Sequence, residues 1–201
     1  MVEVRDPIAP KRNAAGILLA VLVAFLCLTL TGGALAGWLL LERAECGTGD
    51  YTLRDELRVK TFAFGIFRAP EWTETYSTEP FHIMRAWLSE TYNAVVFVDY
   101  LLYNCGHTQA DRDAYFSDES FRTQILANYQ DVEKIAVCND GDTTLYIYTA
   151  RLGGYDYLTH TWAMPDGKYR ILEVFMAFPA SQQDMLNEYA RRLFPKLSSC
   201  P

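Results

Sequence analysis

The chain has few of the residues, and none of the short motifs, that carry common enzyme chemistry. It has only three histidines, His82, His107 and His160, and they fall in separate segments. It contains neither GxSxG nor HExxH, and it has no glycine-rich phosphate loop. No CxxC pair of the kind that binds zinc occurs. The sequence therefore predicts no catalytic residue, no metal site and no cofactor, and it favours a protein that is not an enzyme.

Positive charge is also scarce. Lysine and arginine number 18 against 25 aspartates and glutamates, which gives a net charge of -7 at pH 7. A nucleic-acid-binding domain needs a basic face, and anionic lipid headgroups attract clusters of lysine and arginine. The charge balance therefore excludes nucleic acid as a partner and argues against a domain that lies flat on anionic lipid.

What the sequence does have is one long apolar run, residues 14–41, with no charged residue between Arg12 and Glu42. The hydrocarbon core of a bilayer is about 30 Å thick, and a helix needs about 20 apolar residues to cross it. Inside hydrocarbon, a single segment can form hydrogen bonds with all its backbone N–H and C=O groups only as a helix. The run therefore predicts a transmembrane helix over 14–41 and a short tail over 1–13.

A cleaved signal peptide is the alternative to an uncleaved anchor. Ala34 and Ala36 have the spacing of a cleavage site, and Lys11 and Arg12 supply a basic start. However, the apolar part of a signal peptide is usually about 7–15 residues long. This run is longer and continues past Ala36, so we interpret it as an uncleaved signal anchor.

The charges beside the run predict its orientation. Three basic residues precede it, whereas the first charged residue after it is Glu42. Loops rich in lysine and arginine stay in the cytoplasm. We therefore expect a single-pass protein of the cell membrane with a cytoplasmic N-terminus and an extracytoplasmic C-terminal domain.

The outer half of the run contains small residues, among them Gly33 and Gly37. A GxxxG spacing lets two membrane helices approach closely, although glycine is also common in membrane helices in general. We interpret Gly33 and Gly37 as a membrane-helix contact. The expected partners are thus the lipid bilayer and another protein.

Four cysteines follow the run: Cys46, Cys105, Cys138 and Cys200. An even number in an extracytoplasmic domain predicts two disulfides. Three pairings are possible, and we favour Cys105–Cys138 together with Cys46–Cys200, which would join the two ends of the domain. A nucleophilic pair of Cys105 and His107 is the alternative for that segment.

Two parts follow the membrane segment. Residues 42–60 are polar and contain two glycines, which predicts a stalk, and residues 61–201 have the length of one domain. Alternating apolar residues over 62–66 predict a strand. Residues 91–103 combine a strand-like composition with helix-like features, and we expect a strand in their first half.

Two helices are predicted in the middle of the domain. Thr108 and Asp111 have the spacing of a capping box, in which each side chain accepts a backbone N–H of the other residue. A second helix is expected to begin at Ser117 or Asp118.

Four strand-like runs follow, separated by short turns that contain glycine. They cover residues 133–139, 143–151, 155–164 and 169–178. Such turns join antiparallel neighbours, so an antiparallel meander is predicted. Residues 182–197 then predict an amphipathic helix, capped by Ser181, that packs on the sheet. The fold class is therefore α+β, with one N-terminal transmembrane helix before an antiparallel sheet and its packed helices.

A meander closed by an amphipathic C-terminal helix resembles the Mog1/PsbP-like α/β sandwich, over residues 133–197. The resemblance rests on the order of the elements. It implies an accessory or binding protein without catalysis, and it assigns no functional residue.

Aromatic residues alternate in the predicted meander, at Tyr146, Tyr148, Tyr155, Tyr157 and Trp162. On one exposed sheet face they would form an aromatic surface for a partner or an apolar ligand. Burial under the C-terminal helix is the alternative.

Together these features predict a membrane-anchored extracytoplasmic domain that binds another protein and does not catalyse a reaction. The alternatives are a membrane-tethered hydrolase or small-ligand-binding domain, and an accessory structural subunit of a membrane complex.

Overall fold

The computed structural model describes four stretches of the chain, residues 52–79, 82–102, 108–167 and 170–201. They belong to one compact unit. The predicted tail and transmembrane helix over 1–41 lie outside the described residues, as do Gly33, Gly37, Cys46 and Cys105. Within the described stretches, no helix is long and apolar enough to cross a membrane.

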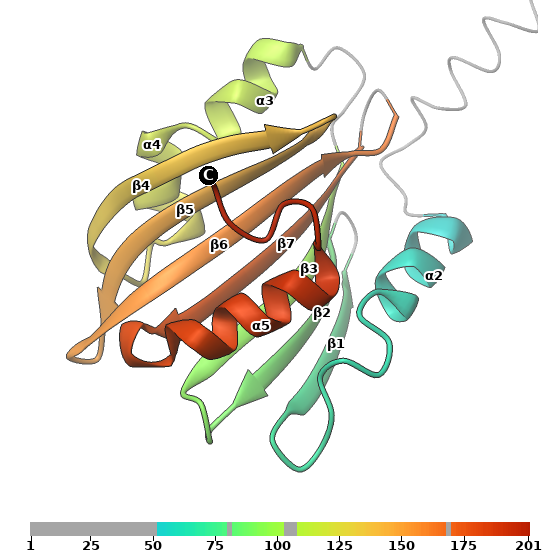
Figure 1. Ribbon diagram of the computed structural model, residues 1–201. Coiled ribbons are helices and arrows are strands. Elements are labelled where there is room, and N and C mark those ends of the chain that lie inside the picture. The colour runs from blue at the N-terminus through green and yellow to red at the C-terminus, as the bar shows by residue number, and fades with distance from the viewer. Residues whose placement is uncertain (1–51, 80–81, 103–107, 168–169) are drawn as a thin grey trace, which may run out of the picture. The chain divides into compact units, whose positions relative to one another are not determined.

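One antiparallel sheet of seven strands organises the domain (Figure 1). The strands are β1 (Thr73–Glu79), β2 (His82–Ser89), β3 (Ala94–Leu102), β4 (Gln130–Asp140), β5 (Thr143–Leu152), β6 (Tyr155–Pro165) and β7 (Arg170–Pro179). Their order across the sheet is β1-β2-β3-β7-β6-β5-β4. The sheet thus consists of two meanders, β1–β3 and β4–β7, joined where β3 pairs with β7.

The predicted α+β class and the four-strand meander are confirmed, whereas the N-terminal half of the domain was predicted less well. Residues 62–66 form turns instead of a strand, and β3 is extended over its whole length instead of its first half only. Strands β1 and β2 were not predicted. The sequence of β1, TETYSTE, is polar because it is an edge strand, and its Glu74 pairs with Arg85 of β2 at 2.8 Å.

The connection from β3 to β4 covers one face of the sheet, which we call the α3 face. It carries α3 (Gln109–Tyr115), α4 (Asp118–Ser120) and a π-helical turn, Phe121–Ile125. The predicted capping box of Thr108 and Asp111 is confirmed, and Ser117 caps α4 as expected. Aromatic residues fill the space beneath, among them Phe116, Phe121, Tyr148, Tyr157 and Phe175.

Helices α2 (Leu53–Thr61) and α5 (Gln183–Leu193) pack on the opposite face, which we call the α5 face. Helix α2 corrects the prediction of a stalk over 42–60 for its described part, residues 52–60, whereas residues 42–51 lie outside the described residues. The helix begins with a second capping box, Thr52 with Asp55, and it buries Val59 in the core. The capping box lies in a polar stretch, and the polar composition of that stretch predicted a stalk instead of a helix.

Ion pairs fix α2 to the sheet. Asp166, in the turn between β6 and β7, accepts a hydrogen bond from the Tyr100 hydroxyl and lies 2.6 Å from the Arg58 guanidinium. The buried Asp55 carboxylate lies 3.3 Å from the Arg170 guanidinium. Helix α2 is therefore an integral part of the domain.

The predicted C-terminal helix is shorter than expected and is followed by an extended segment. It ends at Leu193, and a 3₁₀ turn precedes it instead of a Ser181 cap. The segment after it, residues 194–201, crosses the α5 face towards β4 (Figure 1). Phe194 stacks on Trp162 at 4.4 Å, and the Trp162 indole donates a hydrogen bond to the Leu197 carbonyl at 2.7 Å.

The disulfide joins Cys138 of β4 to Cys200 of this segment. Both predicted bonds, Cys105–Cys138 and Cys46–Cys200, are therefore wrong. The predicted pairing joined neighbouring elements and the two ends of the domain, whereas the extended segment after α5 brings Cys200 back to the edge strand β4. The bond closes a loop of 62 residues.

Candidate functional site

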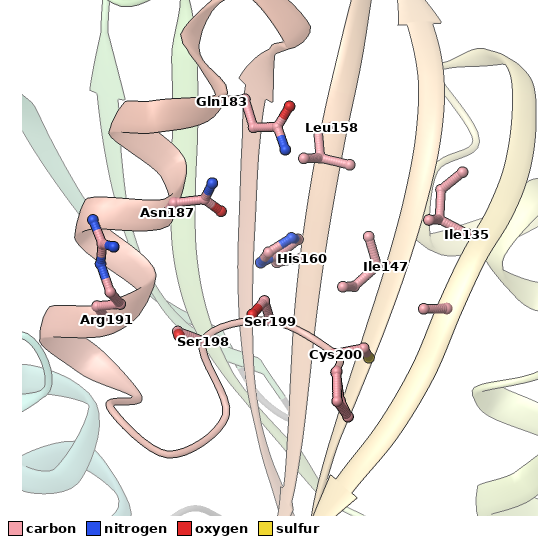
Figure 2. A pocket seen from close by; sticks show the side chains of 12 residues that line it. Ile135, Ile147, Leu158, His160, Gln183, Asn187, Arg191, Ser198, Ser199 and Cys200 are labelled. Atoms are coloured by element: carbon pink, nitrogen blue, oxygen red, sulfur yellow. The ribbon is translucent and has the colours of Figure 1, made fainter.

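A pocket opens on the α5 face between the sheet, α5 and the C-terminal segment (Figure 2). Its volume is about 470 Å³, which lies within the usual range for small-molecule sites. Twelve residues line it: Ile135, Ala136, Ile147, Leu158, His160, Gln183, Asn187, Arg191, Ser198, Ser199, Cys200 and Pro201. The pocket thus combines β4, β5, β6, α5 and the end of the described chain.

The floor of the pocket is largely apolar. Ile147 of β5 pairs with His160 of β6 across the sheet, and both side chains point from the sheet into the pocket (Figure 2). Leu158 lies two residues before His160 and so shares its face. Ile135, at an irregularity in the register of edge strand β4, is 56% exposed. Such a floor can bury the apolar part of a ligand.

One face of α5 forms a polar wall. Gln183, Asn187 and Arg191 follow one another at intervals of four residues, which places them on one side of the helix. All three line the pocket. In Figure 2, Gln183 and Asn187 extend from the helix towards the strands, whereas the exposed guanidinium of Arg191 lies along the helix at the edge of the pocket. The apolar residues of α5, such as Leu186 and Ala190, are buried against the sheet instead. The helix therefore has one side for the core and an adjacent side for the pocket.

His160 is the most unusual group of the pocket. Its side chain is only 2% exposed, and its Nδ1 atom has no hydrogen-bond partner in the described part of the chain. Burial lowers the pKa of His160 to about 4, because the charged imidazolium loses its hydration. The Trp162 ring lies edge-on at 5.4 Å. His160 is therefore neutral at physiological pH. Its Nδ1 is buried, so the ring nitrogen that a bound molecule can reach is Nε2, which also has no hydrogen-bond partner in the described chain.

Arg191 is the single charged side chain among the residues that line the pocket. Within the described stretches it has no ion-pair partner. Its neighbour Arg192 instead lies 3.9 Å from Glu188 and 5.7 Å from the Tyr189 ring centre. The pocket thus has one positively charged side chain and no acidic side chain among its lining residues, in a protein whose net charge is -7.

The pocket lacks the usual arrangement for acid–base or nucleophilic catalysis. A catalytic histidine is normally oriented by a third group, often a carboxylate, and none of the lining residues is acidic. In the described part of the chain, no three His, Cys, Asp or Glu side chains come together to hold a metal ion. The arrangement is suited to binding by hydrogen bonds, one charge and apolar contact.

The predicted aromatic surface does not exist as a common surface. Tyr148, Tyr157 and Trp162 are buried, and Tyr146 is partly buried. Trp162 points to the α5 face, whereas Tyr146, Tyr148 and Tyr157 pack in the α3-face cluster. Only Tyr155 is largely exposed, at 59%. The alternative, burial under the C-terminal helix, therefore fits only Trp162, because the buried tyrosines lie on the opposite face of the sheet.

A second group of polar side chains lies on the α3 face. Asp99 and Glu173 are partners across β3 and β7, and both are buried. The Tyr115 hydroxyl lies 3.4 Å from the Glu173 carboxylate. Because these carboxylates are covered, they are not placed to meet a substrate from solvent.

The pocket was not predicted from the sequence, although its residues carried a weak signal. His160 alternates with Leu158 and Trp162, which indicates that it shares their buried face. The polar series Gln183, Asn187 and Arg191 runs beside the apolar face of a predicted helix. Neither pattern shows that the two faces meet, because that depends on how α5 crosses the sheet.

Comparison with protein-family models, curated proteins and solved structures finds no match to this chain. The resemblance to Mog1/PsbP-like domains therefore stays a prediction.

Proposed function

We propose that this chain is a single-pass membrane protein whose extracytoplasmic domain binds a small molecule in the α5 pocket and catalyses no reaction. The pocket carries the proposal, since it combines an apolar floor with a buried, neutral histidine whose ring nitrogens have no hydrogen-bond partner within the described chain. Polar groups without partners on a buried side chain are rare in folded proteins and need an explanation. A ligand that hydrogen-bonds to Nε2 of His160 would supply a partner.

The membrane anchor and the compartment are supported by separate observations. The apolar run over 14–41 has the length of a membrane helix, and the basic residues before it favour a cytoplasmic N-terminus. The Cys138–Cys200 bond agrees with an extracytoplasmic domain, since structural disulfides persist in oxidising compartments.

We propose a small molecule, and not a protein, as the partner of the domain. Most of the aromatic side chains proposed for a protein contact are buried, whereas the pocket has the size of a small-molecule site. A tethered hydrolase is the second candidate, since Ser198, Ser199 and His160 line the same pocket. We favour binding because no acidic side chain lines the pocket to orient the imidazole.

A fragment screen on the full-length protein in lipid nanodiscs tests the proposal. Ligand-observed NMR would detect bound fragments in the wild type. Asn187→Trp fills the pocket from α5, whereas Glu188→Trp adds the same bulk to the exposed neighbouring position. We expect Asn187→Trp to abolish binding and Glu188→Trp to retain it.

Three results would contradict the proposal. One is that no fragment binds the wild type, and another is that both variants retain binding. The third is turnover of an ester substrate, such as p-nitrophenyl acetate, that disappears in His160→Gln, because this would make the pocket a catalytic site.

A further inference from the structure

We infer that the ligand of this pocket is a small organic monoanion, with one carboxylate on an apolar body. The inference rests on the binding function proposed above and names the chemical class of the ligand. Three observations lead to it: the charge of the polar wall, the composition of the floor and the position of His160.

The charge of the pocket selects an anion. Arg191 has no ion-pair partner in the described part of the chain, and no acidic side chain lines the pocket beside it. A guanidinium binds a carboxylate through two parallel hydrogen bonds, which are stronger than those between neutral groups. An amine ligand would meet a like charge at this position, so cations are disfavoured.

The charges of the lining residues also favour a ligand with one negative charge over a ligand with two. The buried imidazole of His160 is neutral and offers no second positive charge. Asn187 and Gln183 supply uncharged amide groups along the wall. A dianion such as a phosphate monoester would bring a second negative charge without a counter-charge among the lining residues, and burial of an unpaired charge is costly.

The floor requires an apolar body. Ile135, Ile147 and Leu158 present hydrocarbon to the space beneath the polar wall (Figure 2). Burial of apolar surface stabilises a complex by roughly 25 cal/mol per Å². A carboxylate held by Arg191 at one end of the wall therefore directs an attached hydrocarbon group over these side chains.

His160 favours a hydrogen-bonding group on that body. In Figure 2 its ring lies between Asn187 of α5 and Ile147 of β5. A hydroxyl group can both donate and accept a hydrogen bond, so it matches either tautomer of a neutral imidazole. Nε2 of the ring has no hydrogen-bond partner in the described chain and, unlike Nδ1, is not among its buried atoms. A ligand hydroxyl at Nε2 would therefore add a hydrogen bond that the described chain does not make.

The test uses four compounds of similar shape and the full-length protein in nanodiscs of zwitterionic lipid. The compounds are cyclohexanecarboxylate, cyclohexanecarboxamide, cyclohexylmethylamine and trans-4-hydroxycyclohexanecarboxylate. Dissociation constants are measured by ligand-observed NMR at pH 7. We expect the carboxylate to bind at least about tenfold more tightly than the amide or the amine, and the hydroxy acid to bind more tightly than the carboxylate.

Two matched variants locate the charge. Arg191→Gln should weaken carboxylate binding about tenfold and leave amide binding unchanged. Arg192→Gln removes the same charge from the adjacent helix position and should leave both affinities unchanged, because Arg192 interacts with Glu188 and Tyr189. His160→Phe should abolish the advantage of the hydroxy acid over the carboxylate. Circular dichroism would establish that each variant is folded.

The outcomes separate this inference from the proposed function. If the amide or the amine binds as tightly as the carboxylate, or if Arg192→Gln has the effect of Arg191→Gln, the inference is wrong while a binding pocket remains. If fragments bind but none of the four compounds does, the inference is also wrong. If neither fragments nor these compounds bind, both proposals fail.

Discussion

Replacing Cys138 and Cys200 together by alanine removes the bond between β4 and the C-terminal segment. The bond closes a loop of 62 residues. In the chain-entropy model, closing a loop of this length lowers the conformational entropy of the unfolded chain and thereby stabilises the folded state by about 4 kcal/mol. Folded domains are stable by only about 5–15 kcal/mol. The double variant should therefore lose a substantial part of the free energy of unfolding.

Urea unfolding of the full-length protein in detergent micelles, followed by tryptophan fluorescence, measures this loss. Trp162 is a suitable reporter, since it packs beneath Phe194 of the same segment. The wild type with reductant should behave like the double variant without it. Cys27→Ala is the control, because this cysteine lies in the predicted membrane helix, and it should leave the transition unchanged.

Two results would contradict this role of the disulfide: a loss of less than about 1 kcal/mol in the free energy of unfolding of the double variant, or a wild-type transition that reductant does not shift. The same variant also tests the pocket, because Cys200 lines it. With the C-terminal segment released from β4, the affinity for cyclohexanecarboxylate should fall.

Three further predictions concern pH, α2 and the covalent structure. The pKa of His160 is about 4 in the folded protein, against an ordinary value of 6.5. The unfolded chain therefore binds the proton more tightly than the folded protein does. The free energy of unfolding should fall by about 3 kcal/mol as the pH drops from 6.5 to 4. Urea unfolding across this range should give a flatter profile for His160→Phe, and an NMR titration midpoint near 6.5 for His160 would contradict the argument. Asp55→Asn weakens the buried contact with Arg170 and should cost about 1–3 kcal/mol. Glu56→Gln, beside it on the exposed side of α2, should cost less than about 0.5 kcal/mol in the same unfolding assay. Peptide mapping without reduction should recover the peptides of Cys138 and Cys200 joined by a disulfide. If the anchor is uncleaved, N-terminal sequencing of the mature protein should not give a start directly after Ala36.

Local signals in the sequence were sufficient for much of the fold. The glycine-bearing turns between β4, β5, β6 and β7 indicate antiparallel neighbours because each joins two strands over a few residues. The Thr108–Asp111 capping box is equally local. Strand β1 gave no such signal, since its polar residues become a strand only through pairing with β2.

The long-range features were not predictable in the same way. The disulfide pairing depends on where α5 ends, and a helix that continued past Leu193 would direct Cys200 elsewhere. The pocket depends on the side-by-side placement of His160 and Asn187, which belong to a strand and a helix. No pattern within either segment encodes their meeting.

The pairing of β3 with β7 has a consequence for biosynthesis. The ribosome completes β1–β3 long before it makes β7. The inner edge of β3 therefore has no partner strand while six other elements, α3, α4, the π-helical turn, β4, β5 and β6, are synthesised. This waiting edge is apolar, with the sequence AVVFVDYLL, and unpaired apolar edges promote association between chains. A nascent chain that stalls between residues 102 and 170 should therefore aggregate, and the domain reaches a protected state only when its last strand arrives in the middle of the sheet.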